Sequence, residues 1–147
     1  MDPEEKYKHW QEIAKYDLET AYAMLEAGRY AYVAFMCQQA VEKMVKGLHV
    51  LYLDEEAVKT HNIAKVFKSI FDKPVNSEIT GQQEFGAKQE KVTRFFAELL
   101  YYYISERYPS YKRKVASFIS KEKAEAIFNE TKEVFIWLES LSQYRMK

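Results

Sequence analysis

Cysteine and histidine are scarce in this sequence, which has one cysteine and three histidines among 147 residues. Because Cys37 has no second cysteine to pair with, an internal disulfide is excluded and a zinc site is disfavoured. The histidines, at positions 9, 49 and 61, include no pair at the i, i+4 spacing that puts two metal ligands on one helix face. We therefore expect no metal and no other cofactor.

Long apolar runs and the usual catalytic motifs are also missing. No stretch approaches the roughly 18 uncharged apolar residues of a membrane-spanning helix, and the acidic start MDPEEK lacks the basic region of a secretory signal. We therefore expect a soluble cytoplasmic protein. The sequence has no P-loop, GxSxG, HExxH, CxxC or Rossmann glycine pattern, and no paired ExxH motifs of a di-iron bundle.

Net charge is absent as well, because 22 Lys and Arg residues balance 22 Asp and Glu residues. A protein that binds nucleic acid over its whole surface should be basic, so any such contact here must be a local patch. Aromatic residues are abundant, with 12 Tyr and 9 Phe. Since tyrosine combines a ring that can be buried with a hydroxyl that stays wet, this excess indicates interfaces or a binding groove.

The strongest pattern that is present is helical, over residues 30–53. A broad apolar arc predicts one buried face, and the opposite arc is predicted to face solvent: Gln38, Gln39, Glu42, Lys43, Lys46 and His49. Ala31, Tyr32 and Phe35 lie near this polar arc, so the start of the helix is apolar almost all round. Either another part of the chain or another chain covers it. We expect either these three residues or the tyrosine-rich end of the helix that begins near Ala87 to lie at a subunit contact.

The same periodicity predicts further helices at both ends of the chain and between them. One begins at Pro3 after the cap Asp2 and stops at Gly28, and others begin near Ile63, near Ala87 and after the cap Ser120. The apolar stripe of the last helix is predicted to be Ala124, Ile127, Phe128, Thr131, Val134, Phe135, Leu138 and Leu141.

Residues 74–86, with two glycines and a proline, are predicted to be irregular. They are short enough for an ordinary connection within one bundle. The fold class predicted is all-α: one domain over residues 1–147, an up-and-down four-helix bundle with one additional short helix.

Two polar residues stand out within this helical pattern. Asp17 falls on the apolar arc of the first helix, and a buried carboxylate needs partners. We expect a structural hydrogen bond to a tyrosine or a basic side chain, because a catalytic role requires a second acid or a base that the sequence does not show. His61 is expected to be a loop residue that packs on the end of the bundle.

Residues 101–114 carry the best candidate for a binding site, because five tyrosines and four cations fall within this stretch. Arginine can hold a phosphate through two hydrogen bonds and tyrosine rings can stack on bases. In the alternative interpretation, the three consecutive tyrosines straddle core and surface and the cations are a solvated charge run. The predicted ligand-binding residues are Tyr103, Arg107, Tyr108, Tyr111, Lys112, Arg113 and Lys114.

Short motifs spread over nearly the whole chain resemble those of one known family. They are Trp10, Ala14, Asp17-Leu18 and Ala21, then Gly28-Arg29-Tyr30, the run from Ala34 to Lys46, Thr60-His61-Asn62-Ile63, and Arg107-Tyr108-Pro109. In order and spacing they resemble the HEPN domain (higher eukaryotes and prokaryotes nucleotide-binding). The resemblance implies a helical bundle, commonly a homodimer, often encoded beside a minimal nucleotidyltransferase as in toxin–antitoxin pairs.

Some members of that family are metal-independent ribonucleases that use an Arg and, after four to six intervening residues, a His. The Arg matches Arg107, but Lys112, Arg113 and Lys114 stand where the His is expected. Lysine and arginine have ordinary pKa values too high for proton transfer near neutral pH. We therefore predict weak or no ribonuclease activity, and Arg107 is the catalytic candidate only if the protein is a ribonuclease.

Three functions remain open at this point. The leading one is a dimeric binding or regulatory module in which residues 107–114 contact a nucleotide, RNA or a partner nucleotidyltransferase. The second is an active ribonuclease in which Lys112 replaces the missing base. The third is a structural bundle without a ligand, which predicts no saturable, salt-sensitive binding of ATP or RNA.

Overall fold

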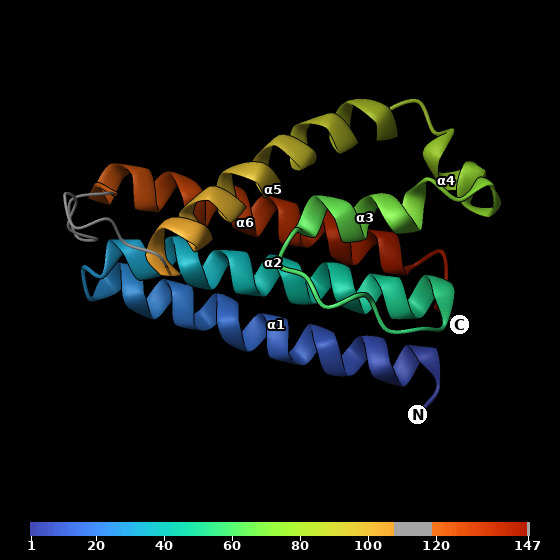
Figure 1. The fold of residues 1–147 in the computed structure, drawn as a ribbon, viewed down its shortest axis with the longest axis horizontal. Helices are drawn as coiled ribbons and strands as arrows, with labels where there is room; N and C mark the ends of the chain where they lie inside the picture. The colour runs from blue at the N-terminus through green and yellow to red at the C-terminus, as the bar shows by residue number, and fades with distance from the viewer. Residues whose placement is uncertain (108–118, 147) are drawn as a thin grey trace.

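The computed structural model describes residues 1–107 and 119–146, and every regular element in these residues is a helix. Four helices are long and run alternately up and down, so that both termini lie at the same end of the molecule (Figure 1). The predicted all-α bundle is thus confirmed. The long helices are α1 (Pro3–Glu26), α2 (Tyr30–Leu53), α5 (Phe85–Arg107) and α6 (Lys121–Ser142), and the short ones are α3 (Ile63–Phe71) and α4 (Ser77–Thr80).

Helix α1 begins and ends where the sequence predicts. The Asp2 side chain accepts a hydrogen bond of 2.9 Å from the Glu5 backbone N–H, and Pro3 occupies the first turn, where its missing N–H has no consequence. At the other end, Gly28 adopts a φ of +73°, and the Arg29 N–H reaches back to the Met24 carbonyl at 2.8 Å. This left-handed turn, which glycine tolerates best, sends the chain directly into α2.

Helix α2 has the predicted bounds but not the predicted wet face. It packs against α1, α3, α5 and α6, and in Figure 1 it runs through the middle of the bundle. Gln38, Glu42 and His49 are buried, and the other members of the polar arc are half-buried. The prediction of a solvent-facing arc was wrong because a helical wheel shows which residues of α2 share a face. It does not show that other helices cover the polar face as well.

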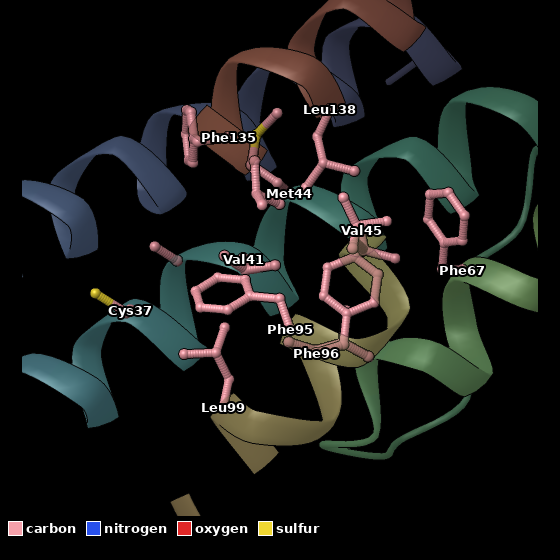
Figure 2. Packing of buried hydrophobic residues seen from close by; sticks show 14 of the residues in the cluster. Cys37, Val41, Met44, Val45, Phe67, Phe95, Phe96, Leu99, Phe135 and Leu138 are labelled. Carbon is pink, nitrogen blue, oxygen red and sulfur yellow. The ribbon is translucent and has the colours of Figure 1, made fainter. Parts of the chain in front are cut away.

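The core is formed where α2 meets α5 and α6. Figure 2 shows Met44 of α2 beside Phe135 and Leu138 of α6, with Phe95 and Phe96 of α5 on the other side of the helix. All eight positions predicted for the apolar stripe of α6 are buried. Burying a side chain of this size contributes about 1.5–3 kcal/mol each, so these contacts fix how α5 and α6 lie on α2.

Residues 74–86 are more regular than predicted. Pro74–Asn76 form a 3-10 turn, α4 follows it, and α5 begins at Phe85, two residues before the expected start. Arg145, beyond α6, holds this segment: its guanidinium donates to the Asn76 side chain at 2.6 Å and to Glu78 at 3.0 Å. A cation from the far end of the chain thus contacts these helical turns, and local sequence patterns do not reveal such contacts.

The chain between α2 and α3 folds back along α2. Asp54 closes α2 in a left-handed conformation with a φ of 53°, and α3 starts at Ile63 with Asn62 as its N-cap. Figure 1 shows the connecting loop running from the end of α2 to its middle. Among the described residues, none of the helices has the length and apolar character needed to cross a membrane.

Candidate functional site

The predicted binding stretch begins at the C-terminal end of α5. The structure describes the backbone of Arg107 as the last residue of this helix. Tyr108, Tyr111, Lys112, Arg113 and Lys114 lie outside the described residues, as does the side chain of Arg107. Tyr103 therefore marks the site in the structure, and it lies one helical turn before Arg107, on the same side of α5.

The three consecutive tyrosines of α5 span surface and core. Tyr101 is 55% exposed, Tyr102 is half-buried, and Tyr103 is 3% exposed. The Tyr103 ring stacks on Phe35 of α2 with ring centroids 5.2 Å apart and lies against the His61 ring at 4.7 Å. Because its ring is buried in this way, Tyr103 cannot stack on a base here, so we reassign it from a ligand contact to a support for the end of α5.

A polar cluster lies next to Tyr103 and is centred on the Glu42 carboxylate of α2. This carboxylate accepts hydrogen bonds from Gln38 Nε2 at 3.3 Å, Lys46 Nζ at 3.2 Å and His61 Nδ1 at 2.9 Å. Three donors thus surround one carboxylate, and hydrogen bonds of this kind to a charged group are stronger than those between neutral groups. Glu42 is 5% exposed, so this arrangement is a buried, well-satisfied anion rather than a surface charge.

His61 enters this cluster from the returning loop, and not at the bundle end where the sequence led us to expect it. Its backbone carbonyl accepts a hydrogen bond of 2.8 Å from Gln38 Nε2, while its ring donates to Glu42. The ring thus lies halfway along α2. The i, i+4 series Gln38, Glu42, Lys46 is the signal that could have indicated a buried polar stripe, but nothing in the sequence places His61 against it.

Asp17 of α1 is the second buried carboxylate. It is 7% exposed and pairs with Lys43 of α2, a basic side chain, which is one of the two partners expected from the sequence. The pair joins α1 to α2. Because Lys43 supplies both a hydrogen bond and a compensating charge, a structural role accounts for the burial of Asp17.

The three predicted interface residues differ in exposure. Tyr32 is 48% exposed, whereas Ala31 and Phe35 are half-buried. Tyr103 of the same chain covers Phe35. An intrachain contact therefore accounts for part of the apolar start of α2, and Tyr32 remains the residue that a second subunit could cover.

A groove of about 510 Å³ lies between α3 and the first half of α5. Its cations do not form a concentrated positive site: Lys68 lies 3.9 Å from Asp72 and Arg94 lies 3.6 Å from Glu90. These partners neutralise two of its three cations, which also include Lys65. No group of three His, Cys, Asp or Glu side chains suited to a metal occurs in residues 1–107 or 119–146.

Comparison with known proteins gives one family and one similar structure. The family model described as HEPN domain matches residues 7–141. The crystal structure of TT1696 from Thermus thermophilus is similar to this chain with a TM-score of 0.68 and 22% sequence identity, over 92% of this chain and 97% of that one. At this identity the likeness shows a shared fold. No curated protein matches significantly.

Proposed function

The chain belongs to the HEPN domain family, and from this premise we propose that it is a nucleotide- or RNA-binding module whose ligand binds at the C-terminal end of α5. The observation that carries the proposal is the anchoring of that end. Tyr103 is packed between α2 and the returning loop, and it lies one helical turn before Arg107, where the cationic stretch of the sequence begins.

Charge supports the same location. The protein has no net charge, and the described groove between α3 and α5 is locally neutralised, whereas four cations lie at 107, 112, 113 and 114. Arginine can hold a phosphate through two hydrogen bonds, and Tyr108 and Tyr111 supply rings for stacking on bases. A phosphate-bearing ligand is therefore the class that this stretch fits best.

We also propose a homodimer and a nucleotidyltransferase partner of the toxin–antitoxin type. Family membership supports both proposals, and the exposed ring of Tyr32 supports the first. Isolation of the chain from its native cells with a nucleotidyltransferase bound would support the partnership. Its recovery without any such protein under mild conditions would contradict it.

Titration of the purified protein with a single-stranded RNA oligomer and with ATP tests the binding proposal. We expect saturable binding to at least one of them that weakens as salt is raised, because phosphate contacts release counterions. Arg107→Ala should weaken binding by about tenfold or more, the loss of one charge-assisted contact. The charge-matched control Lys15→Ala on α1 should not. Absence of saturable binding, or equal loss in both variants, would contradict the proposal.

A further inference from the structure

Residues 72–84, which join α3 to α5 and which we call the α4 loop, leave the bundle and return to it at one point. The ring of Phe71 at the end of α3 lies 5.4 Å from the ring of Phe85 at the start of α5, centroid to centroid. In Figure 1 the α4 loop projects beyond these two helices. A surface loop whose ends are this close can open as a unit without moving the helices that it joins.

Few side chains attach the α4 loop to the bundle. Among its residues, all of which the structure describes, only Asn76 and Ile79 are buried, and Val75 is 74% exposed. Ile79 is 0% exposed and belongs to the same hydrophobic core as Phe71 and Phe85. One apolar side chain therefore supplies the main hydrophobic attachment of the whole loop.

An aromatic cluster lies at the base of the α4 loop. The Phe85 ring is 5.7 Å from the ring of Trp137 on α6, and the Phe67 ring is 4.6 Å from that of Phe71. Because Ile79 is buried in the same core, its withdrawal with the loop would leave an apolar space beside these rings. Aromatic rings favour other aromatic groups as neighbours, in offset or edge-to-face contacts.

A cation from the other end of the chain supplies the polar attachment. Arg145 Nη2 donates to Asn76 Oδ1 at 2.6 Å, and Nη1 donates to Glu78 Oε1 at 3.0 Å. The guanidinium also lies over the Tyr52 ring at 4.8 Å, and the Tyr52 ring is 5.2 Å from that of Phe71. Since Tyr52 belongs to α2, the guanidinium keeps this cation–π contact next to the aromatic cluster when the loop moves away.

We propose that the α4 loop is a flap latched by Arg145, and that its opening uncovers a binding site for an aromatic anion. In the closed state the loop fills this site with its own groups, the Ile79 side chain and the Glu78 carboxylate. A ligand with an aromatic ring and one acidic group offers the same two contacts, the ring to Phe71 and the acid to Arg145. Loop and ligand therefore compete, and the ligand shifts the population toward the open loop.

This site is independent of the proposed nucleotide or RNA site. Phe85 and Arg107 are the first and last residues of α5, so the two sites lie at opposite ends of that helix. Every residue that forms the flap, the latch and the aromatic cluster lies in the described part of the chain.

Reversal of charge at Glu78 opens the latch while the guanidinium stays in place. Glu78→Lys puts a second cation beside Arg145, and the Glu78 side chain is 65% exposed, so the change is tolerable to the fold. The control is Glu90→Lys, which makes the same change beside Arg94, 3.6 Å away on the exposed face of α5. Circular dichroism and a melting temperature confirm that each variant is folded.

Hydrogen exchange followed by mass spectrometry reports the opening of the loop. Two amides near the end of α4 donate to carbonyls within the loop, Gly81 to Ser77 at 2.8 Å and Gln82 to Ile79 at 3.1 Å. A helical turn as short as α4 is not stable away from the bundle, so these amides exchange when the flap opens. Glu78→Lys should speed their exchange by about tenfold or more, the equivalent of one lost charge-assisted hydrogen bond, and leave α1 and α2 unchanged.

Two fluorescent probes test the site that the flap covers. Anilinonaphthalene sulfonate combines aromatic rings with an anion, and phenylnaphthylamine has the same rings without the sulfonate. Both are titrated into the wild type, into Glu78→Lys and into Glu78→Lys combined with Arg145→Gln. Quenching of Trp137 fluorescence, with Trp10 replaced by Phe, shows whether a probe binds beside the aromatic cluster.

We expect the sulfonate to bind Glu78→Lys at one site, about tenfold more tightly than it binds the wild type, and to quench Trp137. Addition of Arg145→Gln should weaken sulfonate binding by about tenfold, because the anion loses its cation, and should leave phenylnaphthylamine binding unchanged. Glu90→Lys should resemble the wild type in exchange and in binding.

Other outcomes overturn the inference in distinguishable ways. Exchange in Glu78→Lys that equals the wild type, or an equal increase in Glu90→Lys, refutes the latch. Faster exchange throughout the chain refutes a flap that opens separately. Local opening without binding of either probe refutes the site, and sulfonate binding that survives the loss of Arg145 refutes the recognition of an anion.

The wild-type protein provides a second measurement that does not depend on a variant. In low concentrations of urea, amides of the α4 loop should exchange through a local opening whose rate is nearly independent of urea. The amides of α2 should exchange only through an unfolding that urea accelerates. If the loop amides follow the α2 amides, the loop does not open on its own and the inference is wrong.

Discussion

Two carboxylates in the interior of this bundle are each matched by a lysine of α2. Asp17 pairs with Lys43 between α1 and α2, and Glu42 pairs with Lys46 within α2. An ion pair at such a site stabilises the fold only while both partners are present, because a single buried charge is strongly unfavourable. Replacing one lysine should therefore change the free energy of unfolding by a measurable amount.

Lys43→Met should lower the free energy of unfolding by about 1–3 kcal/mol, because it leaves the Asp17 carboxylate buried without a cation. Urea denaturation measures this change. Lys15→Met is the matched control, since its pair with Glu139 is 3.5 Å long and the lysine side chain is 55% exposed. It should change stability by less than about 1 kcal/mol. Equal effects of the two substitutions would contradict this account of Asp17.

Cys37 makes stability depend on alkaline pH. Burial raises the pKa of its thiol from 9.0 to about 12. Above pH 9 the unfolded chain loses this proton while the folded chain keeps it, so the unfolded state is favoured increasingly as pH rises toward 12. The free energy of unfolding should fall by up to about 1.4 kcal/mol per pH unit in this window.

Urea midpoints below and above the ordinary thiol pKa, at about pH 8 and about pH 10, test the point in wild type and Cys37→Ala. The variant should be less stable at the lower pH because it lacks a buried side chain, but its stability should depend less on pH. Burial also raises the pKa of Tyr7 and Tyr52, whose ordinary value is 10.0, so their contribution begins at higher pH. A pH dependence in the variant equal to that of the wild type would rule out the thiol as the cause.

At the scale of helices, α1 and α2 approach closely at Gly47. A Cβ atom added there would lie 2.9 Å from the Trp10 Cβ and 3.3 Å from the Tyr7 ring. The first of these contacts involves an atom fixed to the α1 backbone, so a side chain could be accommodated only if the helices moved apart. Glycine therefore sets the spacing of the two helices, although it weakens a helix by itself.

Gly47→Ala should destabilise the protein by about 1–3 kcal/mol, because overpacking outweighs the roughly 1 kcal/mol that alanine adds to helix propensity. Gly86→Ala in the first turn of α5 is the control. No atom lies within 4 Å of the Cβ it would add, so it should be neutral or slightly stabilising. Thermal denaturation of both variants decides the matter, and a stabilising Gly47→Ala would show that the helices are not in tight contact there.

Local sequence patterns predict some features of the helices and not others. The bounds of α2 and the whole buried stripe of α6 follow from periodicity and capping residues, which are local. The burial of Gln38 and Glu42 cannot be predicted from periodicity, because it depends on which elements surround α2. The contact between His61 and Glu42 cannot be predicted in this way either, since only the path of the returning loop brings residue 61 beside residue 42.

The candidate site likewise combines residues that are neighbours in the sequence with one that is not. The cations at 107 and 112–114 are visible in the sequence because they are neighbours in it. Linear spacing puts the expected imidazole shortly after Arg107, where the sequence has none. The structure places one beside Tyr103 from an earlier segment, and linear spacing contains no information on such an approach.

At the scale of the whole molecule, the exposed start of α2 bears on assembly. We expect the wild-type protein to be a dimer at micromolar concentration, and Tyr32→Glu to shift it toward the monomer, because a charge at a subunit contact must be desolvated. Light scattering after gel filtration measures both states. Tyr16→Glu on α1, where the tyrosine is 69% exposed, is the control and should leave the dimer intact. A monomeric wild-type protein would contradict the proposed contact.

The central claim, that a nucleotide or RNA binds at the end of α5, can be tested through the three histidines of the chain, because the ring of His61 lies against Tyr103, one helical turn before Arg107. Their ring Cε1–H signals can be assigned by substitution and followed by NMR while the single-stranded RNA oligomer or ATP is added. The account predicts a shift of the His61 signal that saturates with one ligand bound per chain, with the His9 and His49 signals nearly unchanged. Binding that leaves the His61 signal in place, or that shifts His9 or His49 instead, would contradict it.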